Sequence, residues 1–454
     1  MQEAADAAAV RVSQAPYPAR AIAWYATILL ALLYWLSILD RFIIALLVDP
    51  IKHDLGLTDL QFGLLQGIAF AGTFAIFGLA CGALADRYSR RWVIFAGVSI
   101  WSLATAACGF AQNFWHLLLA RVGVGAAEAA LNPSATSLLT DLFPPQRLTF
   151  AMAVYSMGST VGAGSAFLIG GAIVGLVAQL EPISLPFVGE LRPWQVVFFI
   201  VGVPGALLSF SIFTVPEPVR RGPRSLPGTQ RSWFSAYREL FNFIKSQRRF
   251  FVCHYVGFAF ASTVVVGGAS WYPVHMSRSF GWSTAEVGLY LGLTLAAAAI
   301  VGKLAAGHLI DMLYQRGMRD AQLRWYVGCL LAAIPAGIVA MTSTHPWVFL
   351  GGLGLYLVLL QPLPVCAFTA LNLVTPSQLR GTGVALFTAT SGLIGGGLGP
   401  VLIPAAARYI FRDESAIGQG MAVVIAVCCP IAAVSLALGL RGMRAAIAAS
   451  EQST

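Results

Sequence analysis

The chain has 454 residues, of which 58% are hydrophobic and only 10% are charged, and its mean hydropathy is +0.76. Soluble domains carry about 25% charged residues, so this composition excludes a soluble globular protein and predicts a polytopic membrane protein. The net charge of +9 does not indicate a nucleic-acid partner. Membrane proteins collect Lys and Arg in cytoplasmic loops, and no basic run interleaved with aromatic residues occurs outside the central loop.

Twelve apolar segments are each near or above the roughly 20 residues that a transmembrane helix needs. They occupy residues 21–48, 59–85, 92–110, 115–139, 149–177, 195–214, 250–276, 284–310, 324–343, 347–373, 379–407 and 417–440. The chain therefore divides into a tail (1–20), a six-helix bundle (21–214), a linker (215–249), a second six-helix bundle (250–441) and a second tail (442–454). The predicted class is an all-α membrane protein.

Basic residues are concentrated in one set of loops. Besides the central loop, this set contains Arg87, Arg90, Arg91, Arg147, Arg316, Arg319, Arg324, Arg380, Arg441 and Arg444. The opposite set contains Lys52, Arg192, Arg278, Arg408 and Arg412. Because loops rich in Lys and Arg stay in the cytoplasm, we expect both termini to be cytoplasmic. The short tails and loops favour a bacterial inner membrane.

The linker contains a predicted amphipathic helix. Its apolar residues recur at helical spacing, at Trp233, Tyr237, Phe241 and Ile244. The basic residues Arg238, Lys245 and Arg248 lie largely off that stripe, as in helices that rest on a membrane surface. We interpret the helix as a tether between the two halves, with lipid sensing or a regulatory contact as the alternative.

Four charged residues lie inside apolar segments: Asp40, Arg41, Arg121 and Glu128. A charge in hydrocarbon costs roughly 3 kcal/mol even on lenient insertion scales, so these residues indicate a polar interior. Arg121 and Glu128 are seven residues apart, which places them on one helix face at levels about 10 Å apart. Asp40 and Arg41 are adjacent and diverge by about 100°, so they face different neighbours. A buried carboxylate near a cation gains or loses a proton as its surroundings change, which a proton-driven carrier needs.

A short charged motif follows the second segment and is partly repeated after the eighth. Its residues are Gly82, Asp86, Arg87, Arg90 and Arg91, and the second copy keeps Gly307 and Asp311. This motif resembles the signature loop of the major facilitator superfamily. The resemblance implies two parallel six-helix repeats and alternating access. Asp86 lies on the side where the eleventh segment begins, and a helix N-terminus stabilises a carboxylate. We therefore expect the motif residues Gly82, Asp86, Arg90, Arg91 and Asp311 to gate the cytoplasmic side.

A closer resemblance covers residues 37–165 most densely. It runs through 40–42, 63–66, 86–90, 95–103, 121–129, Pro133 and 141–143. Together these stretches resemble the Spinster family of proton-linked lysolipid and sphingolipid transporters. The resemblance implies that Asp40 and Glu128 are protonation sites. It also implies that Arg41 and Arg121 pair with them or hold an anionic head group, with the proton gradient as driving force and no other cofactor.

Weaker candidates for the cavity are polar residues on other apolar segments: Tyr34, Ser37, His254, Thr263, Lys303, Gln361 and Asn372. Metal-ligand, nucleophile-elbow and P-loop motifs are absent from the sequence, which argues against an enzyme. The predicted protein is a monomeric proton-coupled transporter in a lipid bilayer, moving a lysophospholipid- or sphingolipid-like amphipath. An organic-anion symporter and a multidrug exporter of the same superfamily are the alternatives.

Overall fold

The computed structural model describes residues 17–179, 183–185, 189–220, 233–376 and 379–452. Most of the predicted N-terminal tail and the middle of the predicted linker lie outside these ranges. The side chains of Asp86 and Trp233 also lie outside the described part of the chain.

The first half of the chain contains the first six predicted spans and a short hairpin. Its elements are α2 (Arg20–Ile43), η1 (Ile44–Leu46), α3 (Val48–Leu55), α4 (Asp59–Gln66), η2 (Ile68–Gly72), α5 (Thr73–Arg87), α6 (Arg90–Cys108), α7 (Phe114–Glu128), α8 (Leu131–Leu142), α9 (Pro145–Val177), β1 (Ile183–Leu185), β2 (Gly189–Leu191), α10 (Pro193–Ser209) and η3 (Phe210–Thr214). The two strands pair antiparallel, with Ser184 opposite Glu190.

The second half begins with the linker helix. Its elements are α11 (Trp233–Ser246), α12 (Arg248–Phe280), α13 (Thr284–Gln315), α14 (Ala321–Thr342), α15 (Pro346–Leu360), α16 (Leu363–Val374), α17 (Arg380–Ser391), η4 (Gly392–Gly396), α18 (Gly397–Ala406), η5 (Ala407–Phe411) and α19 (Ile417–Gln452).

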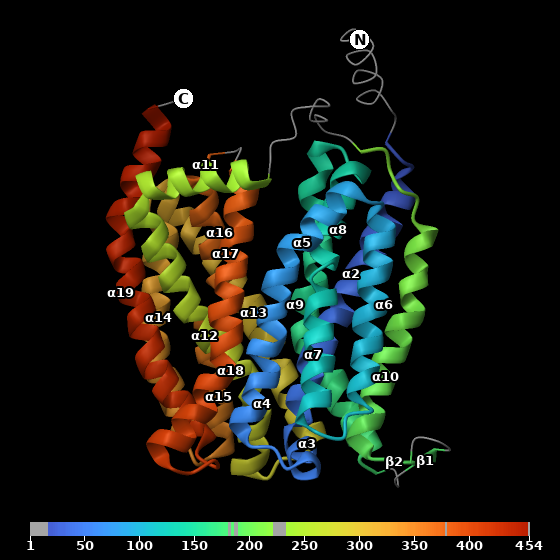
Figure 1. Cartoon of the computed structure of the whole chain (residues 1–454). Helices are drawn as coiled ribbons and strands as arrows, with labels where there is room; N and C mark the ends of the chain where they lie inside the picture. Colours follow the sequence, from blue (N-terminus) through green and yellow to red (C-terminus); the bar gives the residue numbers. More distant parts are fainter. Residues whose placement is uncertain (1–16, 180–182, 186–188, 221–232, 377–378, 453–454) are drawn as a thin grey trace.

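The predicted fold class is confirmed: the described residues contain twelve helices long and apolar enough to cross a membrane. The two halves stand side by side, and α2 begins at the same end of the molecule at which α19 ends (Figure 1). We call this the terminal end. The opposite, distal end carries α3 and the hairpin of β1 and β2 (Figure 1). Helix α3 is an additional short helix that the hydropathy pattern does not predict.

Prolines explain where several spans are interrupted. The fourth span breaks between α7 and α8 at Ala129 and Ala130, ahead of Pro133. Proline has no N–H, and its ring clashes with the carbonyl four residues earlier, which here belongs to Ala129. Pro362 and Pro364 separate α15 from α16 in the same way. The break in the fourth span places Glu128 at the last position of α7, in the interior of the span.

Helix α11 lies across the terminal end of the second half (Figure 1), but its buried face differs from the predicted stripe. Leu240 is fully buried, whereas Phe241 is 51% exposed. Tyr237 and Ile244 are partly buried, as expected. Leu240 satisfies the same helical periodicity and contacts the bundle near Gly383 of α17, whereas Phe241 does not pack against the protein and stays available to a membrane surface.

The two halves approach closely along two glycine-rich seams towards the distal end. Between α9 and α13, a Cβ added to Gly171 would lie 2.8 Å from the Cα of Gly288. Between α4 and α18, a Cβ added to Gly63 would lie 2.5 Å from the carbonyl oxygen of Pro400. Any side chain at these glycines would force the backbones apart, so the distal ends of the halves are in direct contact.

Candidate functional site

Asp40, on α2, is buried in the first half with an exposed fraction of 2%. Thr105 of α6 donates a hydrogen bond of 2.6 Å from its hydroxyl to one carboxyl oxygen of Asp40. The other oxygen, Oδ1, is buried and has no hydrogen-bond partner among the described residues. A buried carboxyl with one unsatisfied oxygen is a position where a proton reduces the cost of burial.

Glu128 is also 2% exposed. One of its oxygens accepts hydrogen bonds from the Ser37 hydroxyl and from the Arg41 guanidinium, both on α2. The second oxygen, Oε2, is buried without a hydrogen-bond partner in the described part of the chain. Because Arg41 is 30% exposed at its side chain, this ion pair lies at the margin of the buried region, where a competing ligand could reach it.

Arg121 does not form the ion pair with Glu128 that the shared helix face predicts. Arg121 as a whole residue is 2% exposed, its Nε has no hydrogen-bond partner, and no described carboxylate lies within ion-pair distance. The physical reason is that two helical turns separate the levels of the two side chains by about 10 Å, while Arg41 approaches Glu128 from a neighbouring helix. The structure therefore contains a buried cation that lacks a partner among the described residues.

An aromatic ring joins the two arginines. The guanidinium carbons of Arg41 and Arg121 lie 4.8 Å and 5.1 Å from the centre of the Phe70 ring, and Arg41 also lies 5.2 Å from Phe74. Cation–π contacts stabilise a guanidinium without neutralising its charge. The cluster Asp40, Arg41, Arg121 and Glu128, with Phe70 between the arginines, is thus one site. We call it the central charge site.

Arg90 and Arg91 of the signature loop contact the first half and the start of the linker, not the second half. Arg90 is fully buried and pairs with Asp141 of α8 and, at 2.8 Å, with Glu217 directly after η3. Arg91 donates its backbone N–H to Glu217 at 3.2 Å and its side chain to the Val215 carbonyl at 3.1 Å. The expected contact between halves is therefore not made by these two side chains, because the segment that follows η3 already satisfies them.

Glu217 is held by three donors, since the Ser89 hydroxyl also donates to it at 2.6 Å. Burial acts to raise the pKa of Glu217, but the hydrogen bonds from Ser89 and Arg90 outweigh it and lower the pKa below the ordinary 4.5. Glu217 was not among the residues predicted from the sequence. The Pro–Glu–Pro run that contains it marks a linker and carries no further signal for a buried ion pair.

The other predicted gating residues give less information. The Asp86 side chain lies outside the described part of the structure. Gly82 has open space where a Cβ would stand, so no close approach requires glycine there. Asp311 is exposed at the terminal end of α13.

The predicted cavity residues divide into two groups. Tyr34 and Ser37 lie near the central charge site: Ser37 bonds to Glu128, and the Tyr34 ring stacks on that of Tyr155 at 5.1 Å. His254 and Thr263 lie elsewhere, packed inside the second half. His254 bonds to the Ala367 carbonyl at 2.9 Å, and Thr263 bonds to the carbonyl of Ala259 in its own helix at 3.0 Å. These are contacts of helix packing.

The remaining candidates lie at helix interfaces of the second half. Lys303 reaches across to the first half and donates to the Thr160 hydroxyl at 3.3 Å. Gln361 ends α15 at its proline break, and Asn372 is partly exposed on α16. In the described structure, none of the three forms a hydrogen bond or ion pair with the central charge site. In the described part of the chain, no group of three His, Cys, Asp or Glu residues is placed to hold a metal ion.

Comparison with known proteins agrees with this architecture. The sequence profile described as Major Facilitator Superfamily matches residues 30–400, and the chain belongs to that superfamily. It is therefore a transporter and an integral membrane protein, not an enzyme.

Among its relatives is an "MFS-type efflux pump" of Mycolicibacterium smegmatis, 30% identical over 410 residues, 89% of each chain. "Protein spinster homolog 1" of Xenopus tropicalis is 25% identical over 86% of this chain and 74% of its own length. A crystal structure of a bacterial homologue of the human lysosomal transporter Spinster, inward-facing and unoccupied, is 26% identical, covers 94% of this chain and 98% of its own, and has a TM-score of 0.78. The resemblance to the Spinster branch is confirmed.

Proposed function

We propose that this protein is a proton-coupled transporter that works by alternating access on an amphipathic substrate with an anionic or zwitterionic head group, of the lysophospholipid or sphingolipid type. The observation that carries the proposal is the buried guanidinium of Arg121, which lacks a carboxylate partner among the described residues. Arginine suits phosphate and carboxylate groups because its planar donors bind two oxygens at once. The similarity to Spinster proteins supports the lipid class.

Proton coupling follows from competition for Arg41. When Glu128 is ionised, it holds the Arg41 guanidinium. Protonation of Glu128 removes that negative charge and frees Arg41, which shares the Phe70 ring with Arg121, for a substrate anion. Proton binding and anion binding therefore favour each other, and by linkage the effect is reciprocal. Asp40, buried on the adjacent face of α2, is the second protonation site in this proposal.

A second candidate function is export of another small organic molecule. It is favoured by the similarity to the mycobacterial efflux pump. A hydrophobic cation would require an ionised carboxylate that is free to receive it. Glu128 is paired with Arg41, and Asp40 is buried with its carboxyl bonded to Thr105, whereas Arg121 is a cation without a carboxylate partner among the described residues. These contacts favour an anionic substrate over a cationic one.

We further propose that the terminal end faces the cytoplasm of a bacterial inner membrane and that the protein works as a monomer, driven by the proton gradient without another cofactor. The concentration of Lys and Arg in the loops of that end supports this orientation. A phosphatase fused to the C-terminus, active only outside the cytoplasm, should remain inactive; an active fusion would reverse the orientation.

The test is transport by purified protein in proteoliposomes with an imposed pH gradient. Labelled lysophospholipid is followed beside a plain organic anion. The wild type should move the lysophospholipid in response to the gradient, and Glu128→Gln should lose this dependence while remaining folded. Movement of the organic anion without the lysophospholipid would contradict the lipid assignment.

The matched control is Glu286→Gln, in the capping box that opens α13 at the distal end. Glutamine serves that capping role as well as glutamate, so this variant should transport like the wild type. If Glu128→Gln moves substrate with unchanged pH dependence, Glu128 is not a coupling site.

A further inference from the structure

A cluster of ion pairs joins the two halves at the distal end, far along the spans from the central charge site. It contains Asp49 and Lys52 of α3 and Asp59 of α4 on one side, and Arg278 of α12 and Glu414, between η5 and α19, on the other. Among the described side chains, the ion pairs that bridge the halves all belong to this cluster.

Arg278 is the centre of the cluster. Its two terminal nitrogens donate to both oxygens of Asp59, at 2.8 Å and 2.9 Å. Its Nε and one terminal nitrogen also donate to Asp49, at 2.9 Å and 2.6 Å. Such bidentate pairs are among the strongest and most directional hydrogen bonds in proteins. Asp59 is 1% exposed at its side chain, so its charge depends on these partners.

The charges are divided unequally between the halves. The first half contributes two carboxylates and one ammonium group, with Lys52 paired to Asp59. The second half contributes two guanidinium groups and one carboxylate, because Arg408 pairs with Glu414 at 3.7 Å. Among these described cations of the second half, Arg278 is the one that pairs with carboxylates of the first half, whereas Arg408 pairs with Glu414 of its own half. Each side also keeps an internal pair, Lys52 with Asp59 and Arg408 with Glu414, when the halves part.

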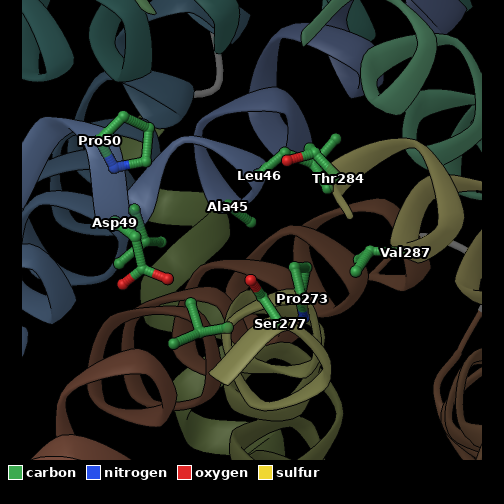
Figure 2. Close-up of a pocket in the computed structure, with 10 residues that line it drawn as sticks. Ala45, Leu46, Asp49, Pro50, Pro273, Ser277, Thr284 and Val287 are labelled. Atoms are coloured by element: carbon green, nitrogen blue, oxygen red, sulfur yellow. The ribbon is translucent and has the colours of Figure 1, made fainter. Parts of the chain in front are cut away.

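A small pocket lies beside the cluster, of about 120 Å³. Figure 2 shows Pro273 and Ser277 of α12 and Asp49 of α3 around it, with Ala45 and Leu46 of η1 on the side of the first half. The pocket thus lies between the halves at their closed distal end. Ser277 is partly exposed in this closed state, and separation of the halves would increase its exposure to solvent.

We infer that Arg278, Asp49 and Asp59 form the distal gate of the transporter: an electrostatic clamp that holds this end closed and breaks whenever the substrate path opens there. The intact pair of Lys52 with Asp59 keeps the buried carboxylate compensated in the open state, so the gate opens without leaving an isolated buried charge. This inference requires only alternating access and does not depend on the substrate or on proton coupling.

The experiment uses Ser277→Cys as a reporter of opening in the full chain, purified in detergent. The rate of modification by a water-soluble maleimide is measured, with the wild type as the blank for the native cysteines. Added Arg278→Gln or Asp59→Asn should increase the modification rate about tenfold, because each removes the bidentate, charge-assisted hydrogen bonds that join the two halves. Arg278→Lys keeps the positive charge, so its modification rate should stay near that of Ser277→Cys alone.

Arg408→Gln is the matched control, because it removes an arginine of the same end whose described pair lies within one half. It should leave the modification rate unchanged. Asp49→Asn, at a side chain that is 43% exposed, tests the clamp if the buried substitutions do not yield folded protein. Unchanged modification in folded Arg278→Gln, Asp59→Asn or Asp49→Asn, or equal acceleration by Arg408→Gln, would overturn the inference.

Discussion

Single charged residues determine what this apolar chain can do. The sequence identified four candidate residues, Asp40, Arg41, Arg121 and Glu128. A charge inside an apolar segment costs free energy in a membrane, so it indicates a functional site or a buried partner. Their partners were not identifiable. The Arg41–Glu128 pair joins two helices, and Phe70 is one of 28 phenylalanines with nothing in the pattern to distinguish it. Spacing along one helix predicted an Arg121–Glu128 pair, whereas tertiary packing supplied a different cation.

Glu217 carries a prediction about pH at the residue scale. Its pKa is lowered in the folded protein, so its stabilising contribution is complete above its ordinary value of 4.5 and is lost as the pH falls through the lower, folded value. Glu217→Gln should therefore lower the thermal midpoint at neutral pH and show a smaller further decrease under acid conditions than the wild type. Thermal unfolding in detergent at pH about 7 and about 4 measures both.

The control for this prediction is Glu190→Gln, at an exposed carboxylate of the distal hairpin. It should unfold like the wild type at both pH values. Equal midpoints for Glu217→Gln and the wild type at neutral pH would mean that the contacts of Glu217 with Ser89 and Arg90 do not stabilise the fold.

At the scale of helices, hydropathy was sufficient to predict the twelve spans, because hydrocarbon imposes about 20 apolar residues on each. Proline explains the interruption before Pro133, although the sequence pattern was interpreted as one continuous span there. The orientation of α11 about its axis was not predictable, since Leu240 and Phe241 both fit an apolar stripe and only the contact with α17 decides between them.

The seam between α9 and α13 gives a prediction at the element scale. A Cβ at Gly288 would overlap the Phe167 carbonyl and lie 2.8 Å from the Cα of Gly171. Gly288→Ala should destabilise the closed distal end by about 1–3 kcal/mol, as overpacking does elsewhere. The expected results are a lower thermal midpoint and faster modification of Ser277→Cys.

Gly328→Ala is the matched control, because a Cβ there on α14 meets nothing within 4 Å. Alanine is the better helix former by about 1 kcal/mol, so this variant should be as stable as the wild type or more stable. If Gly288→Ala has the same thermal midpoint as the wild type and the modification rate of Ser277→Cys does not change, the close approach of α9 and α13 does not stabilise the closed distal end.

At the scale of the whole molecule, the structure is closed at its distal end by glycine seams and the charge clamp. The signature-loop arginines Arg90 and Arg91 contact the first half and the start of the linker, and no described residue of the second half. The resemblance of that loop to the superfamily signature predicted a cytoplasmic gate there. It did not anticipate the clamp, since Asp49, Asp59 and Arg278 are far apart in the chain and resemble ordinary loop charges.

The central claim is that proton binding at Glu128 and anion binding at the two arginines favour each other. The most direct measurement is the proton uptake that follows addition of an anionic lysophospholipid to the protein in lightly buffered nanodiscs, read with a pH dye. The account predicts proton uptake by the wild type, no uptake by Glu128→Gln, and wild-type uptake by Glu286→Gln. Proton release by the wild type, or equal uptake by Glu128→Gln, would contradict it.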